Sequence, residues 1–199
     1  MHRPLAVGSF LLAVMAIALY GAMLLLPLYF QELRGYGALG AGLLLIPQGV
    51  GALLSRTIGG RLTDDIGPRQ VAIVGFAVLA VATIPFAFAG TATATWWLLL
   101  VLLVRGAGLG LVMTPIMTVA FIGLDRHQMP DASIITRVAQ QVGGSFGTAV
   151  LAVILEAAAR SGGDPVAGFH HAFWWATGFT LLGATCSLLL PNRPAGAGG

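Results

Sequence analysis

Long apolar runs, separated by short segments that hold most of the charges, limit the possible folds of this chain more than any other feature. Asp, Glu, Lys and Arg make up 9% of the 199 residues, whereas 57% are hydrophobic. This proportion leaves too little charge to cover a water-soluble globule. Because the apolar runs recur along the whole sequence and do not alternate with polar faces, we expect the chain to lie in a lipid bilayer.

Six runs approach the roughly 20 residues that a helix needs to cross a bilayer. The stretch between Arg69 and Arg105 is too long for one helix, and the segment from Gly90 to Trp97 predicts a turn within it. Barrel strands would be about ten residues long with alternating polarity, which these runs lack. We therefore predict an all-α membrane protein with a six-transmembrane-helix bundle in residues 1–191 and a flexible cytoplasmic tail at 192–199. The predicted spans are residues 7–30, 39–54, 71–89, 96–122, 132–155 and 172–190.

The arginines indicate the orientation of the bundle, because cytoplasmic loops are enriched in positive charge. A six-span arrangement puts only Arg34 and Arg160 on one side of the membrane. The other side holds Arg3, Arg56, Arg61, Arg69, Arg126, Arg137 and Arg193. Both termini are therefore expected in the cytoplasm.

Several classes of function find no support in the composition. The net charge of +3 comes from scattered arginines that form no patch, so nucleic acid is not an expected partner. Cys186 is the only cysteine, and the histidines at 2, 127, 170 and 171 are too dispersed for a metal site. Hydrolase constellations and nucleotide-binding motifs are also missing. We expect neither an enzyme nor a bound cofactor.

A polar motif follows the second predicted span, running from Gly60 to Arg69 as GRLTDDIGPR. Glycines at its start permit close helix approach, and Asp64 is expected to cap the next helix. An ordinary solvated turn with arginines on the cytoplasmic side is the alternative reading. The segment resembles the G-x-L-x-D-x-x-G-x-R signature of the major facilitator superfamily, matching at Gly60, Asp64, Gly67 and Arg69.

Other stretches resemble one branch of that superfamily, the fourteen-span drug:proton antiporters of the EmrB/QacA type. They are Leu26–Gln31, Ala41–Pro47, Arg105–Gly110 with Pro115, and Ala132–Gly147. The pattern is similar to the C-terminal six-helix half of such transporters. The resemblance implies a bacterial inner-membrane protein.

From this resemblance we expect multidrug efflux: proton-coupled export of drugs or other hydrophobic or cationic small molecules by alternating access. Such transporters pair two six-helix halves, so the chain is expected to be incomplete alone and to need a second half or a homodimer. A truncated, non-transporting fragment and a membrane scaffold or sensor remain as alternatives.

Arg105 is the most unusual residue, because it lies about 13 Å below the Trp96–Trp97 interface at 1.5 Å per residue. An arginine near the bilayer centre costs about 2.5 to 3.5 kcal/mol on insertion scales. It either lines the transport pathway, holds a changing charge pair, or fixes helix packing through hydrogen bonds.

Further candidates lie in the fifth span. Arg137 either joins the charge network or extends back to the cytoplasmic surface, and Gln140 and Gln141 either contact substrate or join helices. Helix packing is predicted at Gly106, Gly108, Gly110, Pro115, Gly143 and Gly147. All acidic residues lie at span ends or in loops, so any proton-carrying acid is expected in a second half.

Overall fold

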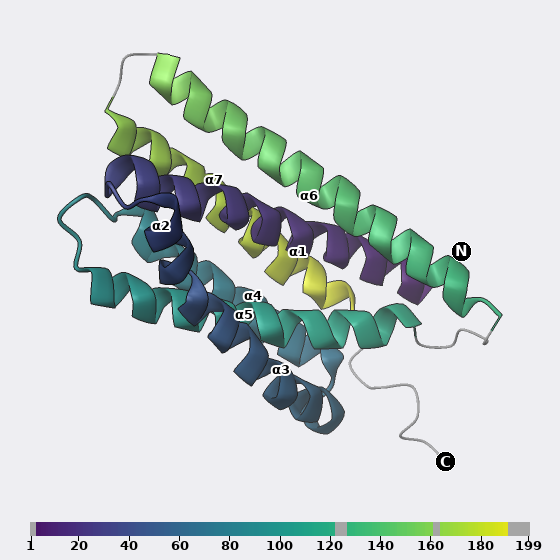
Figure 1. The fold of residues 1–199 in the computed structure, drawn as a ribbon. Helices are drawn as coiled ribbons and strands as arrows, with labels where there is room; N and C mark the ends of the chain where they lie inside the picture. Colours follow the sequence, from purple (N-terminus) through teal and green to yellow (C-terminus); the bar gives the residue numbers. More distant parts are fainter. Residues whose placement is uncertain (1–2, 122–126, 161–163, 191–199) are drawn as a thin grey trace.

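The computed structural model describes residues 3–121, 127–160 and 164–190, and they form six helical segments long and apolar enough to cross a membrane. The predicted all-α bundle of six spans is thus confirmed (Figure 1). The elements are α1 (Arg3–Leu28), the π-helix η1 (Tyr29–Leu33), α2 (Ala38–Leu44), α3 (Ile46–Ile66), α4 (Pro68–Thr83), the 3-10 helix η2 (Ile84–Ala87), α5 (Thr95–Phe121), α6 (Met129–Arg160), α7 (Pro165–Cys186) and the 3-10 helix η3 (Ser187–Leu189).

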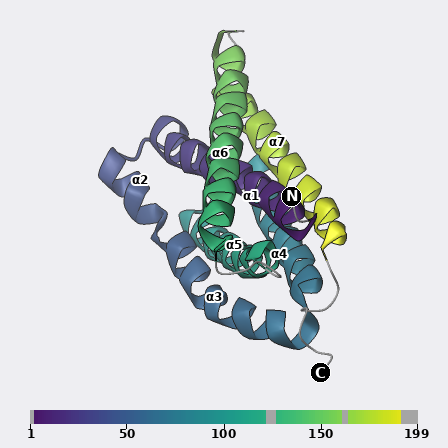
Figure 2. The ribbon, with the colours of Figure 1, turned by 90° about the vertical axis from the view of Figure 1, so that its right-hand side faces the viewer.

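Two packed groups of helices make up the bundle. Helix α5 packs against α3 on one side and α4 on another, while α1 packs against α6, α5 and α7. Figure 2 shows α3 and α6 apart from each other, with α5 between them. These two outer spans are the least covered, since 17% of the α2–α3 window and 22% of the α6 window are buried, against 50 to 56% for the spans of α1, α4 and α5.

The second span is longer than predicted. We expected it to end near Leu54, but α2 and α3 continue it to Ile66, with a break at Leu45 ahead of Pro47. Arg56 and Arg61 therefore lie within α3, not in a loop. Both side chains are exposed on the helix surface, where a long arginine side chain can be accommodated within a span. The helix therefore continues past these two charges.

The motif from Gly60 to Arg69 forms a tight helix–helix junction. Gly67, with φ 95° and ψ 153°, is the single residue between α3 and α4, and its N–H donates to the Thr63 carbonyl at 3.2 Å. This backbone region is open essentially to glycine alone. No side chain caps α4, so the expected capping role of Asp64 was wrong.

Glycines set the close contact between α3 and α5. A Cβ built on Gly106 would overlap the carbonyl oxygen of Gln48, and one on Gly110 would overlap that of Ala52. Pro115 lies buried inside α5. Backbones that approach this closely gain dispersion contacts, which drive helix association where lipid removes the hydrophobic driving force.

Glycines also allow close approach of the helices in the α4–α5 and α1–α6 contacts. A Cβ on Gly108 would lie 2.8 Å from the Leu79 nitrogen. On α6, a Cβ on Gly143 would overlap the Ala13 carbonyl oxygen, and one on Gly147 would lie 2.8 Å from the Ile17 Cα. Three helix pairs therefore depend on the small size of these residues.

A polar cluster closes the end of the bundle where α1 finishes. Arg34 donates to the Gly90 carbonyl at 3.3 Å, to the Thr93 carbonyl, and to the Thr95 hydroxyl at 2.7 Å. A hydrogen bond with Thr95 also lowers the pKa of the Tyr36 phenol, which lies between two spans. These bonds tie the end of the first span to the segment that precedes α5.

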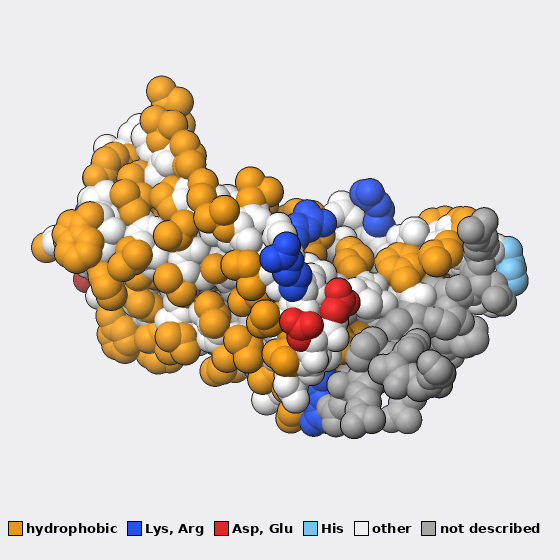
Figure 3. All heavy atoms as spheres, turned by 90° about the horizontal axis from the view of Figure 1, so that it is seen from below, with side chains coloured by type: hydrophobic (Ala, Val, Ile, Leu, Met, Phe, Trp, Pro, Cys, Tyr) orange, Lys and Arg blue, Asp and Glu red, His pale blue; other side chains and the backbone are white. Residues whose placement is uncertain are grey.

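The surface separates apolar from charged regions. Figure 3 shows hydrophobic side chains over a large part of one face, with most of the acidic and basic side chains gathered near the middle of the view. The exposed charged residues of α3 are Arg56, Arg61, Asp64 and Asp65. The predicted tail at 192–199, and Arg126 and Arg193 from the orientation argument, lie outside the described residues.

Candidate functional site

Arg105 lies at the centre of the packed helices and is 1% exposed. Its Nε donates to the Thr83 hydroxyl at 3.3 Å, its Nη1 to Gln48 Oε1 at 3.2 Å, and its Nη2 to the Ala18 carbonyl at 3.2 Å. These acceptors belong to α4, α3 and α1, so one guanidinium on α5 joins four helices at the same depth. Hydrogen bonding of this kind is how a buried arginine is accommodated in an apolar interior.

No carboxylate contacts the Arg105 guanidinium in the part of the chain that the structure describes. All of its acceptors are neutral. The guanidinium therefore contributes a positive electrostatic field that no buried acid offsets among these residues.

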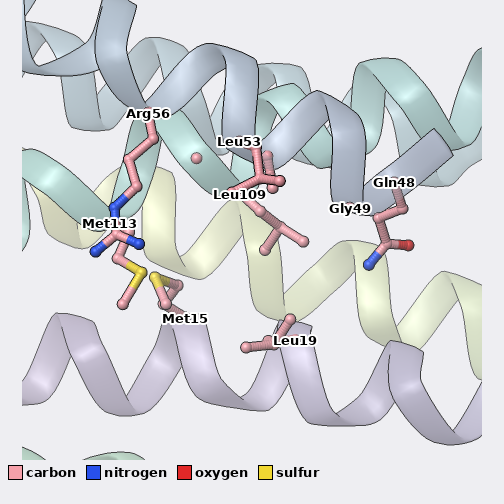
Figure 4. Close-up of a pocket in the computed structure, with 10 residues that line it drawn as sticks. Met15, Leu19, Gln48, Gly49, Leu53, Arg56, Leu109 and Met113 are labelled. Atoms are coloured by element: carbon pink, nitrogen blue, oxygen red, sulfur yellow. The ribbon is translucent and has the colours of Figure 1, made fainter. Parts of the chain in front are cut away.

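A groove of about 390 Å³ lies directly beside this network, between α1, α3 and α5. Its apolar wall is formed by Met15 and Leu19 of α1, Leu53 of α3, and Leu109 and Met113 of α5. Figure 4 shows these side chains facing one another across the groove. Its volume is within the range of about 300 to 1,000 Å³ that is typical of small-molecule sites.

Gln48 joins the groove to Arg105. Arginine only donates hydrogen bonds, so the amide of Gln48 must present its oxygen to the Arg105 Nη1. The amide nitrogen then points away from Arg105, and Figure 4 shows it directed into the groove. Gln48 therefore offers the groove a hydrogen-bond donor and withholds its acceptor.

Arg56 supplies the second polar group of the groove. Its side chain is exposed and extends from α3 toward Met113 and Met15, as Figure 4 shows. Neither a hydrogen bond nor an ion pair joins it to any other residue within 3–121, 127–160 or 164–190. Arg56 lies about 15 Å along the helix axis from the end of α3 at Ile66, at 1.5 Å per residue.

The candidate residues of the fifth predicted span do not line this groove. Arg137 and Gln141 are exposed on α6, and Gln140 is half-buried. Because α6 packs mainly against α1 and α7, the structure does not join these three residues to the Arg105 network. They lie on the other poorly covered helix of the bundle.

Sequence reasoning missed the two polar residues of the groove. Arg56 was taken as a loop residue because a charge was used to end the span. Gln48 is the one amide within residues 39–54, and that signal was available in the sequence. Its connection with Arg105 depends on the crossing of α3 and α5, which no local pattern reveals.

The described residues contain no group of three or more His, Cys, Asp or Glu side chains able to hold a metal. The arrangement consists of an apolar wall, two donors and a buried arginine. It is suited to binding a small molecule and holding it in place.

Comparisons with known proteins show the family to which the chain belongs. The family model described as Major Facilitator Superfamily matches residues 1–148. A multidrug resistance protein B homolog of Mycobacterium tuberculosis is 35% identical over 156 residues, which cover 77% of this chain and 29% of that protein. The lincomycin resistance protein LmrB of Listeria monocytogenes is 32% identical over 196 residues, with 92% of this chain and 42% of that protein covered.

The fold is also found among solved structures. A bacterial homologue of the human drug peptide transporters PepT1 and PepT2 superposes with a TM-score of 0.80 at 22% identity, covering 98% of this chain and 43% of that one. The chain thus spans less than half the length of the proteins it matches. With six membrane-length helices and a family match over residues 1–148, this chain belongs to the Major Facilitator Superfamily, a family of transporters and not of enzymes.

Proposed function

We propose that the chain forms the C-terminal six-helix half of a fourteen-span, proton-coupled exporter of drugs or other hydrophobic small molecules. The observation that carries this proposal is the groove between α1, α3 and α5, which places an apolar wall and two hydrogen-bond donors beside a buried arginine network. The drug-resistance names of the relatives support the substrate class.

The second bundle is the main requirement of the proposal. Alternating access needs two bundles that rock around a site between them, and this chain supplies one. The low burial of the α2–α3 and α6 spans is consistent with a partner bundle that covers them. A second six-helix half or a second copy of this chain would complete the pathway.

The proposed orientation has both termini in the cytoplasm. In Figure 1, α1 begins and α7 ends at the same end of the bundle, as an even number of spans requires. The junction between α3 and α4 lies at that end as well (Figure 1), and Arg61 and Arg69 belong to the two helices that meet there. A positive-inside arrangement follows if this end faces the cytoplasm.

Proton coupling needs a group that takes up and releases a proton in the membrane. The acids among the described residues lie toward helix ends: Glu32, Asp64, Asp65, Asp131, Glu156 and Asp164. We therefore assign the proton-carrying acid to the second bundle. Arg105, Arg137, Gln140 and Gln141 are assigned to the pathway or its charge network on this side.

Efflux measurements test the proposal. Cells are loaded with a fluorescent lipophilic dye, and its loss is followed with and without a proton uncoupler. One strain expresses this chain, and another expresses Listeria monocytogenes LmrB with its matched segment replaced by this chain, which supplies a second bundle. We expect uncoupler-sensitive efflux from the chimera. A chimera present in the membrane at the parental level but without efflux would count against the proposal.

A further inference from the structure

We infer that the groove between α1, α3 and α5 binds an amphipathic carboxylate, with the carboxylate on Arg56 and the apolar body against the methionine and leucine wall. This inference rests on the proposed function and names the substrate class of that same site. The family resemblance suggests hydrophobic or cationic compounds, and the inference replaces the cationic part of that expectation with an anionic one.

The charge of the groove lining favours an anionic ligand. Among the described residues, Arg56 is the only charged one that lines the groove, and none of the others is hydrogen-bonded to it or paired with it. Arg105 lies behind Gln48 and adds a second positive charge, which no acid in the described part of the chain offsets. A lipophilic cation would meet like charge at Arg56, whereas a carboxylate would meet a fork of donors that can bind both of its oxygens.

The direction of the hydrogen bonds favours a ligand rich in acceptors. Gln48 gives its amide oxygen to Arg105, so its NH₂ group is what remains for a ligand. The side chains of the groove therefore present two donors, and apart from the Gln48 oxygen that is already bonded to Arg105 their acceptors are the weak thioether sulfurs of Met15 and Met113. A ligand rich in acceptors satisfies both donors, and one rich in donors satisfies neither.

The spacing of the two polar side chains indicates the shape of the ligand. Gln48 and Arg56 lie about 12 Å apart along α3, at 1.5 Å per residue. Leu53 lies between them on the same helix, and Leu109 faces it from α5. The site therefore fits an elongated molecule with a carboxylate at one end, an apolar body, and a carbonyl or hydroxyl toward the other end.

Three probes that share the same apolar group and differ only in their end group measure the effect of ligand charge on binding. Binding of 1-pyrenebutyrate, 1-pyrenebutanol and 1-pyrenebutyl-trimethylammonium to the full chain is measured by pyrene anisotropy in phosphatidylcholine nanodiscs, with empty nanodiscs subtracted. The neutral lipid removes surface charge as a cause of any preference. We expect saturable binding in the order carboxylate, alcohol, ammonium.

Variants assign the preference to Arg56. Arg56→Gln is expected to weaken carboxylate binding about tenfold, because a charge-assisted hydrogen bond is lost, and to leave the alcohol unchanged. Arg56→Lys keeps the positive charge but loses the fork of donors, so it should retain part of the affinity and bind the carboxylate more tightly than Arg56→Gln does. Arg61→Gln removes an exposed arginine of the same helix that does not line the groove, so it should have no effect.

The outcomes separate the inference from the proposed function. Tighter binding of the ammonium probe, or carboxylate binding that Arg56→Gln leaves intact, would overturn the anionic assignment while keeping the groove as a binding site. If none of the probes bound to folded protein, both the inference and the role of the groove in transport would be lost.

Discussion

The Arg105 guanidinium donates a hydrogen bond of 3.2 Å to the side-chain oxygen of Gln48, and this contact joins the buried centre of the bundle to the wall of the groove. One partner is 1% exposed and the other lines the groove. A change at Gln48 therefore affects both the stability of the helix bundle and the polar lining of the groove.

Substitution of Gln48 separates these two effects. Gln48→Leu leaves one donor of Arg105 without its partner and is expected to lower the free energy of unfolding by about 1 to 3 kcal/mol. Gln48→Glu gives Arg105 an anionic partner and should be more stable than Gln48→Leu. It should also weaken carboxylate binding, because it replaces a donor beside the groove with an acid.

Thermal unfolding of the purified chain in detergent measures the stability of both variants. Equal melting temperatures for Gln48→Leu and the wild type would show that the hydrogen bond with Arg105 contributes nothing to stability. A double-mutant cycle with Arg105→Met would then give no coupling energy.

A methyl group added at Gly106 should disrupt the α3–α5 contact. Because a Cβ there would overlap the Gln48 carbonyl oxygen, Gly106→Ala must separate the two helices, and we expect a loss of about 2 kcal/mol or more. Gly178 is the matched control, since a Cβ on this α7 glycine meets nothing within 4 Å. Gly178→Ala should be neutral or slightly stabilising. Similar melting temperatures for the two variants would contradict the close packing.

The junction between α3 and α4 should require glycine at one position only. Gly67→Ala forces φ 95° on a residue with a side chain and is expected to cost about 1 to 3 kcal/mol. Gly60→Ala lies inside α3, where a Cβ meets nothing within 4 Å, and should leave stability unchanged. If Gly60→Ala also lowered efflux in the LmrB chimera, the motif would have a role beyond folding. A melting temperature for Gly67→Ala equal to that of the wild type would argue against the observed turn.

The Arg34 cluster should stabilise the opposite end of the bundle. Arg34→Gln removes donors from Gly90, Thr93 and Thr95, and the expected loss is about 1 to 2 kcal/mol. Arg61→Gln serves as the control, because Arg61 is exposed on α3. The prediction fails if both variants unfold at the wild-type temperature.

The spans could be predicted from sequence because hydropathy over a membrane-length window reports helix existence well. The division of the stretch between Arg69 and Arg105 at Gly90 agrees with the gap between η2 and α5. The end of the second span was misplaced because Arg56 was treated as a helix boundary. A long side chain on an exposed helix face can remain inside a span, so charge alone does not mark its end.

The candidate site was less predictable. The depth of Arg105 indicated an unusual residue, and its sequence position suggested either packing or function. Its partners Ala18, Gln48 and Thr83 come from three other helices, so no spacing along the chain could identify them. The groove likewise exists only because α1, α3 and α5 cross at these positions.

The most direct test of the central claim, that the groove is an open binding site, is cysteine labelling. Leu53→Cys, which lines the groove, and Leu181→Cys, which is exposed on α7, are made in a Cys186→Ser background. Both are treated with a membrane-impermeant maleimide in nanodiscs, which expose both bilayer faces. The account predicts labelling of Leu53→Cys that 1-pyrenebutyrate blocks, and little labelling of Leu181→Cys. No labelling of Leu53→Cys, or labelling that pyrenebutyrate leaves unchanged, would contradict it.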